Sequence, residues 1–123
     1  MPQVEAGACG KPVIGIRAMA MLDTLVHGET AFLAGIAQTI HITQAVLGPE
    51  SGFESGHRVV FDKPRVSDYR ASSQDIAAYL KLLLNDADLR QRMGAAGRKR
   101  VVERFEYRHV ARSLVDLLSH GRP

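Results

Sequence analysis

The 123-residue sequence has a single cysteine, Cys9, and this scarcity excludes an internal disulfide. We therefore expect a reducing compartment. No apolar stretch approaches the roughly 20 residues that a membrane-spanning helix needs. The first ten residues also lack the charged start and long apolar core of a signal peptide. Together these absences predict a cytoplasmic protein.

The sequence also lacks a pattern of metal-binding or nucleophilic residues. No close metal-ligand spacing relates its five histidines, which are His27, His41, His57, His109 and His120. We therefore predict no metal site. The sequence indicates no histidine partner for Cys9, so we interpret Cys9 as a small buried residue that packs a helix against a strand.

The excess of positive charge is mild. Sixteen Lys and Arg against thirteen Asp and Glu give a net charge of +3, which suits an anionic small ligand or a membrane surface. An arginine-rich segment at 89–105, with Arg108 and Arg112 beyond it, raises a nucleic-acid alternative. Its basic residues interleave with apolar ones at helical spacing, however, and aromatic residues make up only 6% of the chain. We favour a solvated helix face, predict no nucleic-acid partner, and leave open a peripheral contact at the inner membrane surface.

The first third of the chain predicts a strand–helix–strand unit. A short helix over 2–8 ends at Gly10, because Gly tolerates positive φ and Pro12 prevents continuation. The apolar runs at 12–16 and 30–34 then predict two buried strands, with about two turns of helix between them at 21–27. Such a crossover implies that the two strands are parallel neighbours.

The middle of the chain is less clearly patterned. Apolar residues at 36–48 fit both helical and alternating spacing, and we favour a helix there. The segment 48–57 is rich in Gly, Pro and Ser and predicts a loop. A third strand is expected at 58–61, followed by a connection that leads into a helix.

The last third of the chain predicts helices. Ser72 or Ser73 is expected to cap one helix and Asp86 the next. A further helix at 106–119 carries an apolar face formed by Val110, Leu114, Leu117 and Leu118. A length of 123 residues fits one domain, 1–123. The predicted fold class is α/β: a partial Rossmann-like domain with two or three parallel strands and a helix-rich C-terminal third.

Three segments in order carry a resemblance to a known family. These are Glu5–Ile14 (EAGACGKPVI), His27–Leu33 (HGETAFL) and the helical sequence at 83–111. Together they resemble the retaining nucleotide-sugar glycosyltransferases of family 4, also called group 1. These enzymes have the GT-B architecture, in which two Rossmann-like domains enclose the active site. The resemblance covers most of the chain apart from about 36–72, and it implies the C-terminal part of a donor-binding domain of a hexosyltransferase-type enzyme.

The resemblance assigns a role to Glu5. The family has two glutamates separated by seven residues, and Glu5 matches the second, which binds the ribose hydroxyls of the nucleotide. From its residue type alone, Glu5 is better explained as a surface glutamate. The first glutamate and the basic residues that hold the diphosphate would fall upstream of Met1, as would the N-terminal domain. We therefore expect a fragment of a longer enzyme, with no catalytic residue of its own.

The same resemblance assigns Arg17, Ala18 and Met19 to a loop at the donor site. The family often has Gly-Gly where this chain has Met19-Ala20, and Ala31 replaces another common glycine. Glycine lets the backbone approach a ligand closely. The two side chains therefore put close cradling of a phosphate or sugar by this loop in doubt.

Two functions of different classes follow. In the first, the parent enzyme transfers a sugar from a nucleotide-diphosphate donor to an acceptor with retention. It needs no metal or cofactor, and the isolated chain is inactive. The alternative is a non-catalytic module that self-associates. An open strand edge near Val13, Ile14 and Ile16 would in either case favour a homo-oligomer of the fragment.

Overall fold

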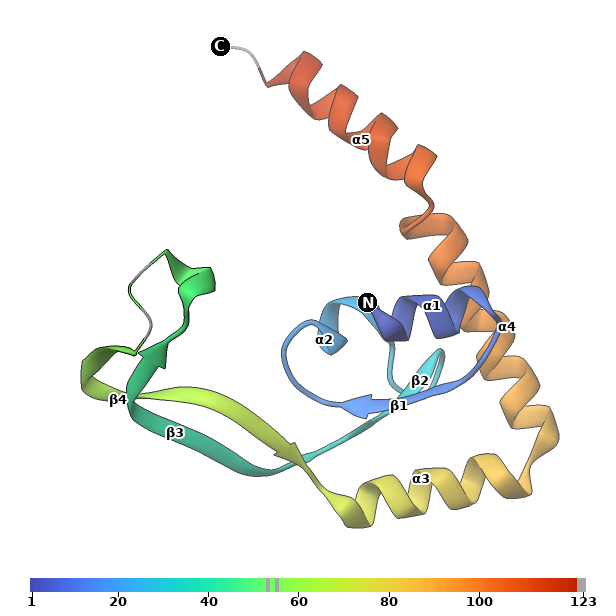
Figure 1. The fold of residues 1–123 in the computed structure, drawn as a ribbon. Coiled ribbons are helices and arrows are strands. Elements are labelled where there is room, and N and C mark those ends of the chain that lie inside the picture. Colours follow the sequence, from blue (N-terminus) through green and yellow to red (C-terminus); the bar gives the residue numbers. More distant parts are fainter. Residues whose placement is uncertain (53, 55, 122–123) are drawn as a thin grey trace.

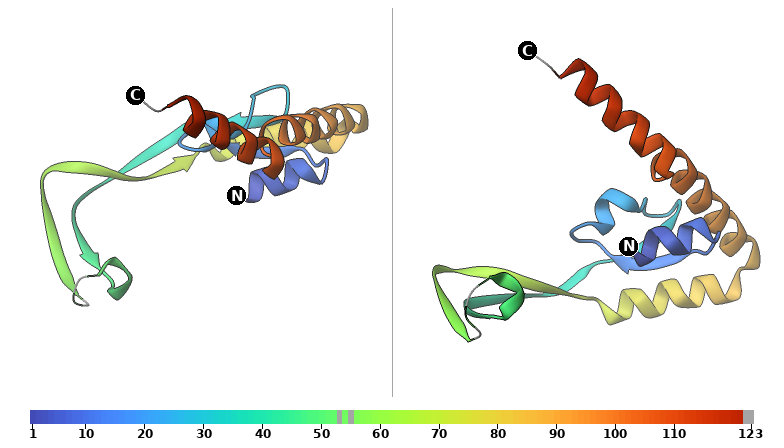
Figure 2. Two further views of the ribbon diagram at one scale, coloured as in Figure 1. Left: turned by 90° about the horizontal axis from the view of Figure 1, so that it is seen from above. Right: turned by 45° about the horizontal axis from the view of Figure 1, so that its top comes forward.

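The computed structural model describes residues 1–52, 54 and 56–121, and it shows an α/β body from which a long β-hairpin projects (Figures 1 and 2). The predicted fold class, with two parallel strands and a helix-rich C-terminal part, is confirmed. In chain order the elements are α1 (Pro2–Ala8), β1 (Val13–Ile16), α2 (Met21–Thr24), β2 (Ala31–Ala34), β3 (Ile36–Leu47), the 3-10 turn η1 (Pro49–Ser51), β4 (His57–Ala71), α3 (Ser73–Asn85), α4 (Ala87–Arg104) and α5 (Tyr107–His120).

Strands β1 and β2 form the expected parallel pair. Val13 lies opposite Ala31 and Ile16 opposite Ala34. Gly10 follows α1 with φ of +67°, the positive value that the sequence predicted. The connecting helix α2 has only four residues instead of about two turns, because Leu25 already adopts an extended backbone.

The middle of the chain corrects two predictions. Ile36–Leu47 is a strand and not a helix, and it pairs antiparallel with β4 in a separate two-stranded sheet. The third strand is therefore not parallel, and β4 also includes residues 62–71, which were expected to be a connection. The predicted loop over 48–57 includes Phe53 and Ser55, which lie outside the described residues. β-Branched Ile, Thr and Val favour the strand conformation once a partner strand is present.

The helix starts follow the predicted caps. The Ser72 hydroxyl accepts a hydrogen bond from the Asp75 backbone N–H at 3.2 Å, and the Asp86 carboxylate accepts one from Leu89 at 2.9 Å. Glu106 caps α5 in the same way, since its carboxylate accepts from the backbone N–H groups of Arg108 and His109. These bonds satisfy amides that have no partner within the helix.

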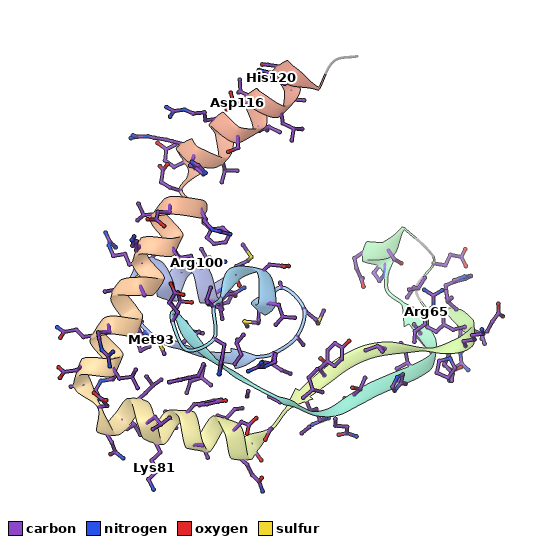
Figure 3. All side chains as sticks on the ribbon, turned by 180° about the vertical axis from the view of Figure 1, so that it is seen from behind. Arg65, Lys81, Met93, Arg100, Asp116 and His120 are labelled. Atoms are coloured by element: carbon purple, nitrogen blue, oxygen red, sulfur yellow. The ribbon has the colours of Figure 1, made fainter. Side chains whose placement is uncertain are left out.

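The core of the body is small and lies between the parallel strands and the helices. Leu25, Ala31 and Leu33 are buried together, with Val13 and Met21 packed against them. Met93 of α4 is only 2% exposed (Figure 3). Much apolar surface therefore remains open, most of all on α5, which extends away from the body (Figure 1). The expected apolar face of that helix is exposed at Val110, Leu114, Leu117 and Leu118.

Candidate functional site

The carboxyl ends of β1 and β2 define the edge at which ligands bind in open α/β sheets. The segment Arg17–Met19 follows β1 directly. The Arg17 backbone N–H donates to the carbonyl of Ala34 at 2.8 Å, so the start of this loop is tied to the end of β2. The Ala18 N–H donates to the carbonyl of Ile16, also at 2.8 Å, which makes the chain turn sharply as it leaves the strand. The loop that the sequence assigned to the donor site therefore lies at this edge.

Met19 has an unusual backbone conformation. Its φ is +55°, and within the described part of the chain the other positive φ values belong to glycines. L-residues other than glycine adopt this region at a cost. The loop thus has a glycine-like backbone at one of the positions where the family that the sequence resembles often has glycine. Met19 is 69% exposed and adds an apolar side chain at the sheet edge, whereas Ala18 is buried.

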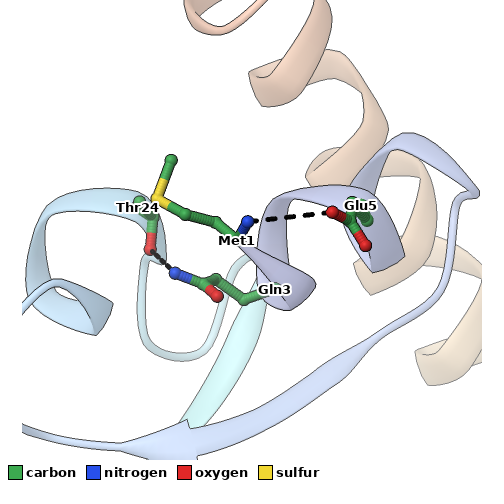
Figure 4. Close-up of polar contacts among 4 residues, drawn as sticks. All are labelled: Met1, Gln3, Glu5 and Thr24. Atoms are coloured by element: carbon green, nitrogen blue, oxygen red, sulfur yellow. Dashed lines mark hydrogen bonds and ion pairs between the residues drawn. The ribbon is translucent and has the colours of Figure 1, made fainter. Parts of the chain in front are cut away.

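Glu5 lies on α1, whose first turn is fixed to α2. Gln3 is buried, and its amide donates to the Thr24 hydroxyl at 3.4 Å (Figure 4). Thr24 in turn donates to the carbonyl of Ala20 at 3.0 Å. The Glu5 side chain is 79% exposed, and its carboxylate lies 3.7 Å from the N-terminal ammonium of Met1 (Figure 4). Its assignment to the nucleotide ribose stays a prediction.

An open hollow of about 450 Å³ lies beside α1 and β1. Its lining residues come from α1, β1 and the start of α2: Pro2, Gln3, Ala6, Pro12, Val13, Ile14 and Met21. The structure thus brings one side of α1 together with the end of the Arg17–Met21 loop. Glu5 and Arg17 are not lining residues of this hollow, and both side chains are exposed.

Three arginines of the basic helix α4 have structural partners. The Arg100 guanidinium donates to the carbonyls of Thr24 at 3.0 Å and Asp23 at 3.1 Å, at the end of α2 (Figure 3 shows Arg100 on α4). Arg98 donates to the Ala8 carbonyl at the end of α1, and Arg90 to the Leu83 carbonyl near the end of α3. Cations are favoured at these carbonyl ends of helices. The predicted solvated face is therefore also a set of helix caps, which local sequence could not reveal.

His27 is a structural residue. Its Nδ1 accepts a hydrogen bond from the Leu33 backbone N–H at 2.9 Å. Its ring also makes T-shaped contacts with Phe32 and Tyr79, which stack on each other with centroids 4.7 Å apart. This cluster anchors β2 to α3.

Cys9 corrects a further prediction, because it is exposed and not buried. It follows α1 directly as the C-cap residue, where the chain turns toward Gly10. Within the described residues, no three of the His, Cys, Asp and Glu side chains gather as a metal-binding group. The helices of the described chain are also too short or too polar for a bilayer span.

Comparison with known proteins identifies the family. Neither the search of curated proteins nor the search of solved structures found a match. A family model described as glycosyl transferase-like matches residues 1–116, which is nearly the whole chain. The glycosyltransferase resemblance drawn from the sequence is therefore confirmed, while family 4 membership and retention stay predictions. The chain belongs to the glycosyl transferase-like family.

Proposed function

We propose that the chain is the C-terminal part of a donor-binding domain from a GT-B enzyme. This enzyme would move a hexosyl group from a nucleotide-diphosphate sugar to an acceptor with retention. The family match supports a transferase parent. The parallel β1–β2 pair supplies the kind of edge at which α/β domains bind nucleotides. The net charge of +3 suits an anionic donor, and we place the enzyme in the cytoplasm, with a peripheral contact at the inner membrane surface.

The observation that carries the proposal is the conformation of Met19. A positive φ of +55° in a non-glycine residue is costly, and such strain is often kept where a binding loop must have a particular shape. The strained residue lies in the loop between β1 and α2, which the family resemblance assigns to the donor. Its backbone can serve the donor even though the side chain is not the family's usual one.

Glu5 supplies the ribose contact in this proposal. A carboxylate offers two acceptor oxygens, which suits the neighbouring hydroxyls of a ribose. Its side chain is exposed, and its surface ion pair with the Met1 ammonium is of a weak kind that a ligand can displace. Because the helix α1 is fixed to α2 through Gln3 and Thr24, the backbone that carries Glu5 has a defined position relative to the donor loop.

Binding can be tested by titrating the 123-residue chain with nucleoside diphosphates and their sugar esters, followed by amide NMR shifts. We expect shifts at α1 and at Arg17–Met21. Glu5→Ala should weaken binding about tenfold or more, because a charge-assisted hydrogen bond is lost. Glu29→Ala is the matched control: Glu29 is also exposed, but it precedes β2 and lies at the opposite edge. Equal binding by both variants would refute the role of Glu5.

Turnover is expected to be absent from this chain alone. The 123 residues hold one glutamate of the family's pair and lack the matching diphosphate-binding bases, and electrostatic catalysis requires those groups in place. No metal or cofactor is needed in this scheme. Transfer of sugar by the purified chain, well above the rate of hydrolysis in buffer, would contradict the assignment of catalysis to other parts of the enzyme.

A further inference from the structure

The hairpin of β3 and β4 forms an arm that leaves the body at the end of β2 and returns at the start of α3 (Figures 1 and 2). Its ladder runs from Ile36 opposite Ala71 at the base to Leu47 opposite His57 near the tip. In the part of the chain that the structure describes, no third strand pairs with either outer edge. A two-stranded hairpin in water is marginally stable, so such an arm gains from a further strand.

The two edges of the arm differ in how they are protected against pairing. Strand β4 contains Pro64 and six charged residues, which are Arg58, Asp62, Lys63, Arg65, Asp68 and Arg70. It also bulges between Val60 and Arg65. This stretch of β4 is longer than the segment of β3 opposite it, which runs from Ile42 to Gln44. Prolines, charges and bulges are the devices by which proteins prevent edge-to-edge association. The outer edge of β4 is therefore blocked.

Strand β3 has none of these side chains. Its 12 residues, IAQTIHITQAVL, include no Asp, Glu, Lys, Arg, Pro or Gly. One register shift, between Ile36 and Gln38, leaves Ala37 of β3 as the additional residue at the base of the arm. At the two shifts beyond it the additional residues lie in β4, so β3 is a regular strand from Gln38 onward. Its outer edge presents N–H and C=O groups in the spacing that another strand needs. The open edge of β3 is therefore a template for pairing.

The sequence of β3 specifies which strand fits this edge. Residues 37–45 read AQTIHITQA, the same in both directions about His41, and the flanking residues Ile36 and Val46 are similar. Two copies aligned antiparallel, with His41 opposite His41, place Ile40 opposite Ile42 and Thr39 opposite Thr43. Gln38 then faces Gln44, and Ala37 faces Ala45. Pairs of β-branched residues and of threonines stabilise antiparallel sheets, and two glutamine amides can each donate to the other.

We propose that β3 pairs with β3 of a second copy across a two-fold axis at His41, and that this contact makes the chain a homodimer. The result is a four-stranded antiparallel sheet in the order β4–β3–β3–β4, with both blocked β4 edges outside. An isologous contact of this kind closes at two copies. It places the tip of each arm beside the base of the other. This interface lies apart from the β1 edge that the sequence suggested, and it does not depend on the proposed transferase function.

Paired charges at Thr39 and Thr43 test the interface, with sedimentation equilibrium of the 123-residue chain as the readout. The unmodified chain should sediment at twice its 13.5 kDa mass. Thr39→Lys with Thr43→Lys sets like charges opposite each other and should weaken the dimer about tenfold or more. Thr39→Lys with Thr43→Glu changes the same two positions but sets opposite charges together, and should keep the dimer. Circular dichroism of both variants is the check that they are folded.

Cysteine pairing tests the register. In a Cys9→Ser background, His41→Cys should form an interchain disulfide with oxidised glutathione. Thr39→Cys alone should not, but an equimolar mixture of Thr39→Cys and Thr43→Cys chains should. A monomer in sedimentation would overturn the proposal. So would a dimer that withstands the two lysines but is dissociated by Ile14→Lys, because that result assigns the contact to β1.

Discussion

Gly94 of α4 packs directly against Gly10, so that a Cβ added at position 94 would overlap the carbonyl oxygen of Gly10. A second glycine pair repeats the contact one turn along, where Gly97 faces Gly7. The absence of a side chain at Gly94 lets α1 lie close to α4. Because α1 leads into β1, this contact also positions the parallel strands.

Replacing Gly94 with alanine should therefore destabilise the body by about 1–3 kcal/mol, as overpacking against backbone does. Gly97→Ala is the matched control on the same helix. A Cβ there would meet the Gly7 Cα at 3.7 Å, an ordinary contact, and alanine favours a helix over glycine by about 1 kcal/mol. Urea unfolding of both variants measures the difference. Equal stabilities would show that α1 moves away from α4 without cost.

The carboxylate of Asp75 should hold the base of the arm. It accepts a hydrogen bond from the Gly35 backbone N–H at 2.8 Å, and the Ser72 N–H donates to the Gly35 carbonyl at the same distance. Asp75→Ala leaves the Gly35 amide without this partner and should cost about 1–3 kcal/mol.

Amide hydrogen exchange at Gly35 is the direct measurement for Asp75→Ala, and faster exchange is expected. Asp88→Ala is the control, because Asp88 is an exposed acid in the first turn of α4. Like Asp75 it interacts favourably with the dipole of its helix, but it does not bind Gly35. If both variants lose the same stability and Gly35 exchange is unchanged, the hydrogen bond contributes nothing.

Arg100 should stabilise α2 through its two bonds to the carbonyls of Thr24 and Asp23. Arg100→Ala removes both donors and should cost about 2 kcal/mol. Arg100→Lys should keep only part of this stability, since one ammonium does not reproduce the planar fork of a guanidinium. Arg104→Ala, an exposed arginine in the last turn of the same helix, should change little. A lower melting temperature for Arg104→Ala than for Arg100→Ala would disprove the capping role.

Local signals in the sequence sufficed for the parallel pair and the helix starts. Gly10, Ser72 and Asp86 act on their immediate neighbours, so their effects could be predicted from residue type and spacing. The arm could not be predicted in this way. Residues 36–47 fit both the helical and the alternating period. They form a strand because they pair with β4, which follows them in the sequence after a loop. The partners of Arg100 lie 76 and 77 residues away, which no local pattern encodes.

In the candidate site, too, some features could be predicted from the local sequence and others could not. The sequence placed Arg17, Ala18 and Met19 in one loop, and the structure puts that loop at the carboxyl edge of β1. That the loop follows β1 was a local inference from the apolar strand. The residue types do not indicate that Ala18 is buried while Met19 and Cys9 are exposed. These features required the three-dimensional arrangement.

Met19→Gly should stabilise the chain, in contrast to most substitutions by glycine. At φ of +55° the Cβ of methionine crowds the backbone, and glycine removes that strain. The unfolded chain gains freedom with glycine, so the net increase in unfolding free energy should be about 1 kcal/mol. Ala18→Gly is the neighbouring control: Ala18 is buried and is not among the residues with positive φ, so its replacement should lose stability. Urea unfolding of the two variants should give changes of opposite sign. A loss of stability in both would mean that the Met19 side chain contributes contacts that outweigh its strained backbone.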